Sequence, residues 1–309
     1  MTIPKLRIGT RGSPLALAQT RETRARLGAA HGVPEDHFEI VVIRTTGDAI
    51  QDRPLAEAGG KGLFTKELDA ALIDGSVDFA VHSSKDLPTQ LPAEIALAGF
   101  LPREDARDAW ISRGGVALAD LPAGAVVGTA SLRRAAQLRR LRPDVTTTLL
   151  RGNVETRLRK VESGEIDATL LALAGLRRLG LDDKASAVLP LDDFLPAAGQ
   201  GAIGIACRAG DAQTAALLEP ILCARTRVAL IAERAFLAVL DGSCRTPIGA
   251  HAIVEGEELS FRGEALSLDG AKSVAASRRG AAADAAHLGE DAARDILARL
   301  PAGGVAALA

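Results

Sequence analysis

Short apolar runs alternate with longer amphipathic stretches along the first two thirds of the chain. A short apolar run bounded by turn residues predicts a buried strand, and apolar residues at helical spacing predict a helix. Strands that alternate with helices in this way indicate parallel sheets covered on both faces. The expected strands are a run starting at Phe79 and residues 6–10, 38–44, 95–100, 108–112, 126–129, 146–150, 168–173 and 203–207.

Two of the expected helix starts carry recognisable capping residues. Ser13 is a good N-cap and Pro14 a good first helical residue, and Ser131 is a good N-cap for the helix that should follow it. In this part of the chain one helix is expected to begin at residue 15. Further helices are expected over 63–74, 132–141 and 154–163.

Two segments are expected to be irregular. Residues 46–62 read as a loop that is mobile when the site is empty, because their glycines leave the backbone too flexible to hold a fixed shape unaided. Residues 196–201 have the sequence Pro-Ala-Ala-Gly-Gln-Gly and are expected to form a hinge.

The last third of the chain changes pattern. After Asp211 the sequence predicts helices, including a long apolar-faced one over 226–240. Three strand-like runs follow, separated by turn residues at 255–256 and 269–270, and they predict a small antiparallel sheet built from hairpins. With a final helix over 290–300, this part reads as an α+β domain.

The first candidate for chemistry is the polar end of the strand that starts at Phe79. Residues just past the C-terminal end of a strand in a parallel α/β sheet face the ligand crevice, and Lys85 and Asp86 stand there. A carboxylate beside an ammonium group is suited to general acid and base catalysis. The alternative is a plain strand-to-helix turn in which Ser84 or Asp86 caps the helix, and the local sequence alone favours that alternative.

Three predicted strand-to-helix junctions share a different chemistry, which suits anions. Each offers a helix N-terminus with free N–H groups and at least one arginine that can bind a carboxylate through two hydrogen bonds. The junctions are 10–13 with Arg11, 128–134 with Arg133 and Arg134, and 150–153 with Arg151 and, one turn later, Arg157. Together with Lys61 and Lys85, they favour a small polyanionic ligand between two α/β domains over ordinary surface arginines.

Two other basic groups are less informative. Arg139, Arg140 and Arg142 lie at the end of a predicted helix, where arginine simply complements the helix dipole. Arg177 and Arg178 also stand near a helix end, and the sequence leaves a structural and a ligand-binding reading open for them.

Charge and cysteine usage narrow the class of protein. The 309 residues carry a net charge of −2, so no overall basic field points to nucleic acid. Three cysteines without C-x-x-C spacing argue against a disulfide framework and a zinc site. Cys207 and Cys223 lie in apolar runs and read as small buried residues, whereas Cys244 stands in a predicted loop beside Arg245 and is a candidate for a reactive thiolate. We see neither a signal-peptide pattern nor an apolar span of membrane length, and expect a cytoplasmic protein.

Read together, these stretches resemble the porphobilinogen deaminase (hydroxymethylbilane synthase) family. Each stretch is weak alone, but their order and spacing over nearly the whole chain are specific. The resemblance rests on residues 11–16, 59–64, 81–88, 128–134, 150–154, 196–201 and 242–244.

The resemblance implies a fold with three domains. Two would be doubly wound α/β domains like those of periplasmic binding proteins, over 1–101 with 201–219 and over 102–200. The third, over 220–309, would be a small α+β domain with a three-stranded antiparallel sheet that carries the cofactor. The strand over 203–207 would return the chain to the first domain.

The resemblance also implies an activity: a transferase of tetrapyrrole and heme biosynthesis. The family condenses four porphobilinogen molecules head to tail into hydroxymethylbilane and releases ammonia each time. Its primer is a dipyrromethane held by a cysteine thioether, and Cys244 matches that position. No nucleic acid, membrane or metal is expected, and the protein is expected to be a monomer.

The matching positions give each candidate residue a role. Asp86 matches the catalytic aspartate, and the accumulating acetate and propionate groups of the chain explain the many arginines. The cofactor-binding positions are matched by Cys244, Lys85, Asp86, Ser131, Arg133 and Arg134. The substrate-binding positions are matched by Arg11, Ser13, Gln19, Lys61, Arg151, Arg157, Arg178 and Gln200.

The sequence departs from the family pattern at two positions. Glu57 replaces a lysine found in many members, which puts in doubt how far its loop helps to bind carboxylates, and Ser243 replaces a glycine before the cysteine.

Two other functions are alternatives to this activity. A dicarboxylate-binding module would explain the arginines but leave Cys244 and the third domain unused. A nucleic-acid-binding protein would rest on residues 133–142, against which the negative net charge and the 3% aromatic content both argue.

Overall fold

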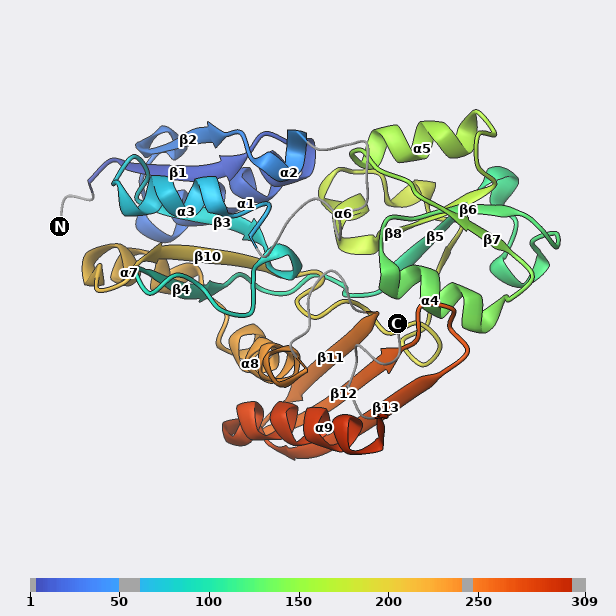
Figure 1. Cartoon of the computed structure of the whole chain (residues 1–309). Coiled ribbons are helices and arrows are strands. Elements are labelled where there is room, and N and C mark those ends of the chain that lie inside the picture. Colours follow the sequence, from blue (N-terminus) through green and yellow to red (C-terminus); the bar gives the residue numbers. More distant parts are fainter. Residues whose placement is uncertain (1–3, 50–61, 241–246, 302–309) are drawn as a thin grey trace. The chain divides into compact units, whose positions relative to one another are not determined.

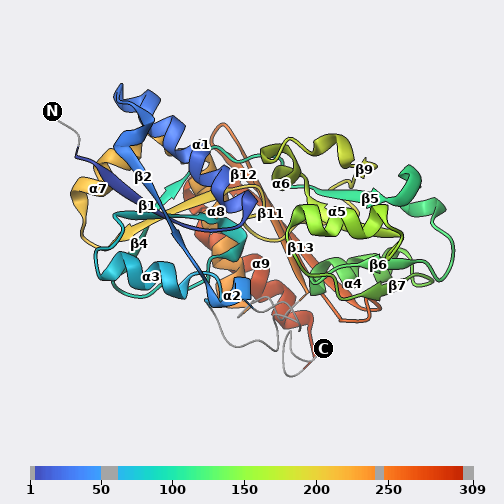
Figure 2. The same ribbon diagram turned by 90° about the horizontal axis from the view of Figure 1, so that it is seen from above.

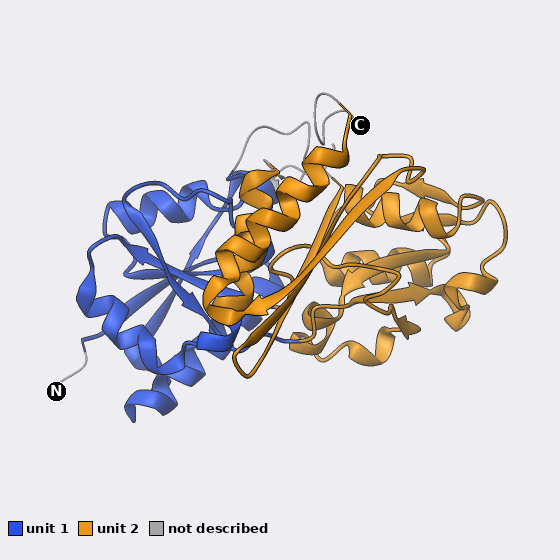
Figure 3. Cartoon of the chain, turned by 90° about the horizontal axis from the view of Figure 1, so that it is seen from below, with its two compact units in different colours: residues 1–50, 59–104, 202–227 blue, residues 51–58, 105–201, 228–309 orange. Residues whose placement is uncertain are grey.

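A computed structural model describes residues 4–49, 62–240 and 247–301. These residues form two five-stranded sheets and one three-stranded sheet, with helices packed on each (Figure 1). The chain divides into two compact units, of which the first comprises residues 1–50, 59–104 and 202–227 and the second the remainder (Figure 3).

The sheet of the first unit has the strand order β2-β1-β3-β10-β4. Its strands are β1 (Leu6–Arg11), β2 (Phe38–Ile43), β3 (Phe79–Ser83), β4 (Ile95–Phe100) and β10 (Ile203–Arg208). Its helices are α1 (Pro14–His31), α2 (Thr46–Ala49), α3 (Lys66–Ile73) and α7 (Ala212–Leu218). Leu27 of α1 packs on one face of the sheet with Phe79 and Val81, and Leu68 and Leu72 of α3 pack on the other. The ribbons of α1 and α3 can be followed in Figure 2.

The second unit contains a sheet with the order β7-β6-β8-β5-β9. Its strands are β5 (Asp108–Ser112), β6 (Val126–Gly128), β7 (Thr146–Thr148), β8 (Ala168–Ala172) and β9 (Ala187–Val188). Leu138 of α4 (Leu132–Leu141) packs on one face, and Leu158 of α5 (Val154–Glu162) and Leu176 of α6 (Leu173–Arg178) pack on the other. The predicted doubly wound α/β architecture is therefore confirmed.

The second unit also contains most of the C-terminal α+β region. Its antiparallel sheet has the order β11-β12-β13, with the strands β11 (Ile248–Glu255), β12 (Glu258–Leu266) and β13 (Ser273–Ala281). The helices α8 (Ala224–Val239) and α9 (Ala285–Arg299) complete the region, and the Phe236 ring of α8 lies 5.1 Å from that of Phe261 on β12. The predicted three-stranded antiparallel sheet is confirmed.

The prediction of parallel sheets was right only for part of each sheet: β1 is parallel to β2 and β3, and β6 is parallel to β7 and β8. β10 runs antiparallel to β3 and β4, and β5 runs antiparallel to β8 and β9. A βαβ crossover within one sheet imposes a parallel neighbour, but β10 follows a long excursion of the chain through the second unit, so its direction is not constrained in that way. The return of this strand to the first sheet, which the resemblance implied, is confirmed.

Several element boundaries also differ from the prediction. Residues 46–49 of the predicted loop form the short helix α2, and α3 starts at Lys66 because Gly62 adopts a φ of 90° and residues 62–65 form turns. The last helix starts at Ala285 rather than 290, and α6 ends at Arg178, where the sequence predicted a helix end without defining the start of the helix. Cys223 is half-buried rather than buried, because it precedes α8 at the edge of its apolar run.

Candidate functional site

The end of β3 carries Asp86 in a single 3₁₀ turn, Ser84–Asp86, in which the Leu87 N–H donates to the Ser84 carbonyl at 3.2 Å. The turn does not open an α-helix, so the capping alternative for Ser84 and Asp86 is not realised. Among the described residues, the buried Nε2 of His82 and Oγ of Ser84 have no hydrogen-bond partner. Burial, helped by the Arg11 charge, lowers the pKa of His82 to about 4, so this imidazole is neutral at physiological pH.

The structure brings Arg11 to Asp86. Because β1 and β3 are parallel neighbours, the strand ends that carry these residues lie at the same edge of the sheet. Arg11 Nη1 lies 3.5 Å from Asp86 Oδ2. The same guanidinium donates through Nε to Asp48 Oδ2 at 3.1 Å and through Nη2 to Asp48 Oδ1. It also stacks over the Phe64 ring, 4.1 Å from its centroid. Asp48 thus occupies one edge of Arg11 in this conformation.

The other predicted residues of the first unit lie along the same sheet edge. The Ser13 hydroxyl caps α1 by accepting the Ala16 N–H at 3.3 Å, so the predicted capping role is confirmed. Gln19 Oε1 accepts the Ser83 hydroxyl at 3.0 Å and so ties α1 to the strand that leads to Lys85 and Asp86. Lys61 lies outside the described residues.

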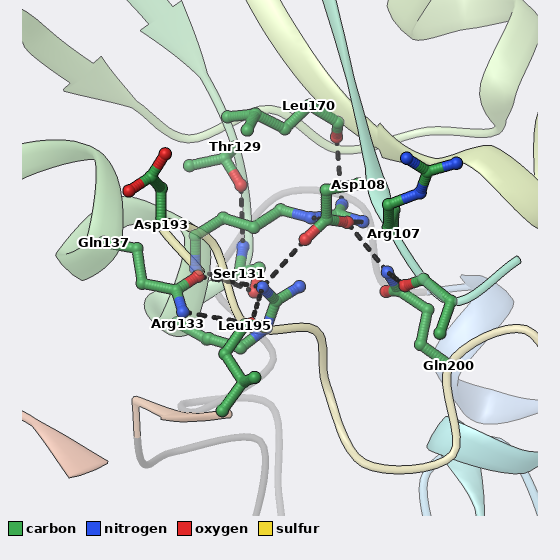
Figure 4. Close-up of polar contacts among 12 residues, drawn as sticks. Arg107, Asp108, Thr129, Ser131, Arg133, Gln137, Leu170, Asp193, Leu195 and Gln200 are labelled. Atoms are coloured by element: carbon green, nitrogen blue, oxygen red, sulfur yellow. Dashed lines mark hydrogen bonds and ion pairs between the residues drawn. The ribbon is translucent and has the colours of Figure 1, made fainter. Parts of the chain in front are cut away.

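A second cluster surrounds Asp108, the fully buried first residue of β5 (Figure 4). Its Oδ2 accepts from Arg133 Nη1 at 2.8 Å, and its Oδ1 accepts from Arg134 Nη2 at 2.6 Å. Gln200 Nε2 donates to the same Oδ1 at 2.9 Å and to the Ala106 carbonyl at 2.7 Å. Three predicted site residues from distant stretches of the chain therefore meet at one carboxylate.

The charges of this cluster do not balance. Burial alone would raise the pKa of Asp108, but the adjacent Arg133 and Arg134 guanidiniums outweigh it and hold that pKa far below its usual range. One carboxylate therefore faces two buried guanidiniums, which leaves an excess of positive charge. The buried Nε of Arg133 has no hydrogen-bond partner among the described residues. An unsatisfied cationic donor of this kind suits a ligand carboxylate.

The remaining predicted residues of the second unit stand at helix ends. The Ser131 hydroxyl caps α4 by accepting the Arg134 N–H, as the sequence predicted. Arg157 Nε donates to the Gly152 carbonyl at 2.9 Å, in the junction that also contains Arg151. Arg178 Nη2 donates to the Gly201 carbonyl at 3.1 Å, directly beside Gln200. Cys244 lies outside the described residues.

The arginines near the end of α4 support the fold. Arg139 donates to the Leu268 carbonyl at 2.5 Å, and Arg142 pairs with Asp144 and donates to the carbonyls of Leu118 and Leu121. These contacts agree with the structural reading of the basic stretch.

Sequence reasoning missed Asp48 and Asp108. Asp108 had a usable signal, because an aspartate inside an apolar strand must find a buried partner. Asp48 had none, since it stands among polar residues of a predicted loop.

Asp108→Asn is expected to lower the free energy of unfolding by about 3–5 kcal/mol, because it leaves two buried guanidiniums without a counter-charge. Since folding lowers the pKa of Asp108, its contribution to stability is complete above the ordinary aspartate pKa and is lost as pH falls towards the folded value. Urea unfolding at neutral pH measures the difference. The exposed Asp120→Asn is the matched control, and equal midpoints for the two variants would contradict the assignment.

Comparison with known proteins identifies the family. The model of the porphobilinogen deaminase dipyromethane cofactor binding domain matches residues 6–216, and that of the porphobilinogen deaminase C-terminal domain matches residues 228–298. The chain belongs to the porphobilinogen deaminase family. It is 61% identical over 292 residues to the porphobilinogen deaminase of Nitrobacter hamburgensis, covering 94% of this chain and 92% of that one. It is 60% identical to the porphobilinogen deaminase of Nitrobacter winogradskyi over 292 residues, which cover 94% of this chain and 92% of that one.

Membership of this family defines the activity. The protein is a transferase that condenses porphobilinogen into hydroxymethylbilane in tetrapyrrole biosynthesis, with a dipyrromethane cofactor. The excess positive charge at Asp108 fits such a group, because each of its pyrroles carries an acetate and a propionate. So does Arg133 Nε, which has no partner in the part of the chain that the structure describes.

Solved structures offer only distant similarities. A putative methionine-binding lipoprotein of Bacillus subtilis aligns with a TM-score of 0.42 at 16% identity, covering 72% of this chain and 91% of that one. An arginine-specific periplasmic binding protein of Salmonella typhimurium aligns with a TM-score of 0.39 at 14% identity, covering 71% and 90%. We base no conclusion on these scores. Within the described ranges, no helix is both long and apolar enough to cross a bilayer.

Proposed function

We propose that Asp86 is the acid and base of the condensation and that Cys244 holds the dipyrromethane as a thioether. The observation that carries the proposal for Asp86 is its meeting with Arg11 at the ends of adjacent parallel strands, 3.5 Å apart. The fixed Arg11 cation can hold a substrate carboxylate close to the Asp86 carboxylate. The proposal for Cys244 rests on its match to the cofactor-bearing cysteine of the family.

Asp86 would act at two points of each addition. As the carbon–nitrogen bond of porphobilinogen breaks, it would direct a proton to the leaving ammonia and stabilise the positive charge left on that pyrrole. After the new carbon–carbon bond forms, its carboxylate would take the proton lost from the α-carbon. The dipyrromethane supplies the free pyrrole α-carbon at which the first substrate couples.

The cationic and polar residues would orient the carboxylates of the cofactor and of the growing chain. For the cofactor we propose Lys85, Asp86, Ser131, Arg133 and Arg134. For the substrate and the growing chain we propose Arg11, Ser13, Gln19, Lys61, Arg151, Arg157, Arg178 and Gln200. The contacts of Arg133 and Arg134 with Asp108 support the cofactor role, since they fix both guanidiniums before the ligand binds.

Some expectations from the sequence also stay proposals. We propose three domains, over 1–101 with 201–219, over 102–200 and over 220–309. We further propose a cytoplasmic monomer, as the sequence and its family resemblance led us to expect. The net charge of −2 and the few aromatic residues support the proposal that it has no nucleic-acid partner.

The experiment that tests the proposed site uses the purified, full-length protein. Intact mass should show a covalent two-ring increment, Ehrlich's reagent should react with the protein, and peptide mapping should place the increment on Cys244. Added porphobilinogen should release ammonia. A protein that binds porphobilinogen without ammonia release or a covalent adduct would instead support the dicarboxylate-binding alternative.

Conservative changes at Arg151 and Arg157 are expected to slow particular additions. Arg157→Lys and Arg151→Lys keep the charge but lose the planar fork, so the elongation steps that use each residue should slow while the others proceed. With limiting porphobilinogen, intact mass should show a ladder of extended enzyme skewed towards one or two intermediates, different for each variant. The exposed Arg159→Lys on the same helix is the control. Ladders with the wild-type distribution, formed only more slowly, would leave these arginines as general electrostatic support.

A further inference from the structure

A fully buried amide links the Asp108 cluster to the C-terminal sheet. Gln137 of α4 lies one helical turn after Arg133, and its Oε1 accepts from Arg133 Nη1 at 3.0 Å. Its Nε2 donates to Glu264 Oε1 of β12 at 2.7 Å and to the Leu195 carbonyl at 3.0 Å. Figure 4 shows the Gln137 amide directed towards Arg133 and Leu195.

The neighbours of this amide fix which way it points. The Glu264 carboxylate and the Leu195 carbonyl only accept hydrogen bonds, so both must be met by the NH₂ group. The amide oxygen is then turned towards Arg133, which only donates. Glu264 and the Leu195 carbonyl therefore fix the orientation of Gln137 together. An amide at position 264 that keeps its oxygen on Arg140 would turn its own NH₂ group towards the Gln137 NH₂ group, so the hydrogen bond between the two side chains would be lost.

Glu264 is itself held in place. It is buried, and its second oxygen accepts from Arg140 Nη1 at 2.5 Å. Arg140 also donates through Nη2 to the Asp193 carbonyl at 2.9 Å. The carboxylate is therefore paired and directed from the side opposite to Gln137, which makes it a rigid acceptor.

Arg133 depends on these contacts for its direction. Its Nη1 is shared by Asp108, Gln137 and the Leu195 carbonyl, whereas its buried Nε has no partner among the described residues. These three acceptors on Nη1 fix the plane of the guanidinium and therefore the direction in which its Nε–H points. Losing one of them would let the plane of the guanidinium turn.

We propose that Glu264, acting through Gln137, is a positioning residue that aims Arg133 at a carboxylate of the dipyrromethane. This inference rests on the cofactor role proposed above for Arg133. It means that the C-terminal family domain, which supplies Cys244, also sets the direction of a guanidinium outside that domain. The same part of the chain would then carry the covalent attachment point of the dipyrromethane and also fix the direction of one guanidinium that binds a carboxylate of that group.

The test follows cofactor loading of the full-length chain made in a purified cell-free translation system, so that it starts without the adduct. Porphobilinogen is added, and intact mass follows the appearance of the covalent increment. Glu264→Gln should slow loading about tenfold, the cost of one misdirected buried hydrogen bond to a charged group. The control Glu257→Gln, which removes an exposed carboxylate from the turn after β11, should stay within about twofold of the wild type.

A double-mutant cycle separates positioning from mere stability. If Glu264 acts through Arg133, Glu264→Gln should slow loading by less than about threefold in an Arg133→Lys background, although it slows the wild-type background about tenfold. Loading by Glu264→Gln at the wild-type rate, or an equal tenfold loss in both backgrounds, would overturn the inference.

Two further comparisons keep the result decisive. If thermal unfolding shows that Glu264→Gln does not fold, Gln137→Met tests the same link, because it removes the acceptor for Arg133 while leaving Glu264 on Arg140. It too should slow loading about tenfold, and wild-type loading would overturn the inference. Arg133→Lys separates the two proposals. If it loads normally, the proposed cofactor role of Arg133 fails, whereas slow loading of Arg133→Lys beside normal loading of the other variants refutes only the positioning role.

Discussion

Cys244→Ala is expected to give a folded protein that carries no covalent dipyrromethane and shows no turnover. Only a cysteine sulfur can form the thioether, and Cys207 is poorly suited to it. Cys207 lies in the buried strand β10, where burial raises the pKa of its thiol. Without the covalent primer no chain can start, so the loss of activity should be complete.

The measurement is intact mass together with ammonia release, on protein purified in the presence of porphobilinogen. Cys223→Ala is the matched control, because Cys223 precedes α8 while Cys244 follows that helix. The control should keep both the adduct and the activity. If Cys244→Ala still carries the adduct, the attachment point must be reassigned to Cys207 or Cys223.

Asp86→Asn is expected to reduce turnover by ~10²–10⁴-fold or more while leaving the fold and the cofactor in place. The asparagine keeps the size of the side chain but can neither take nor return a proton. The fold should tolerate the change, because the contact with Arg11 is long, at 3.5 Å, and partly exposed. An ion pair of that kind contributes only about 0–1 kcal/mol.

Turnover of Asp86→Asn is measured on protein whose intact mass confirms the covalent adduct, so that a loading defect is not mistaken for a catalytic one. The exposed Asp36→Asn, in the same unit, controls for the loss of a carboxylate. Near-normal turnover by adduct-bearing Asp86→Asn would rule out its acid and base role.

The sequence predicted best those features that depend on neighbouring residues. The N-caps Ser13 and Ser131 are confirmed, and β4 and β5 begin and end at the predicted residues. Capping and apolar periodicity act within a few residues, so they can be read without knowledge of the fold. The antiparallel direction of β10 could not be predicted from neighbouring residues, because it depends on the path of the chain through the second unit between β4 and β10.

The contacts between charged and polar residues could not be predicted from the sequence either, because their partners are far apart along the chain. Asp108 lies 25 residues from Arg133, and Gln137 lies 127 residues from Glu264. The sequence marked Arg133 and Arg134 as anion binders, but it gave no indication that a buried carboxylate already fixes both. The roles of the individual site residues remain predictions that the variants above can test.

The place of β10 in the first sheet has a consequence during synthesis. Its neighbours β3 and β4 are both made about a hundred residues earlier than β10, which lies between them. Until residues 203–208 leave the ribosome, these two strands present unpaired edges with no native partner. The nascent N-terminal unit therefore cannot finish folding first, as N-terminal domains usually do, and it must wait until the whole second sheet has been translated. During that interval its open edges are the part of the chain most exposed to aggregation and to chaperone binding.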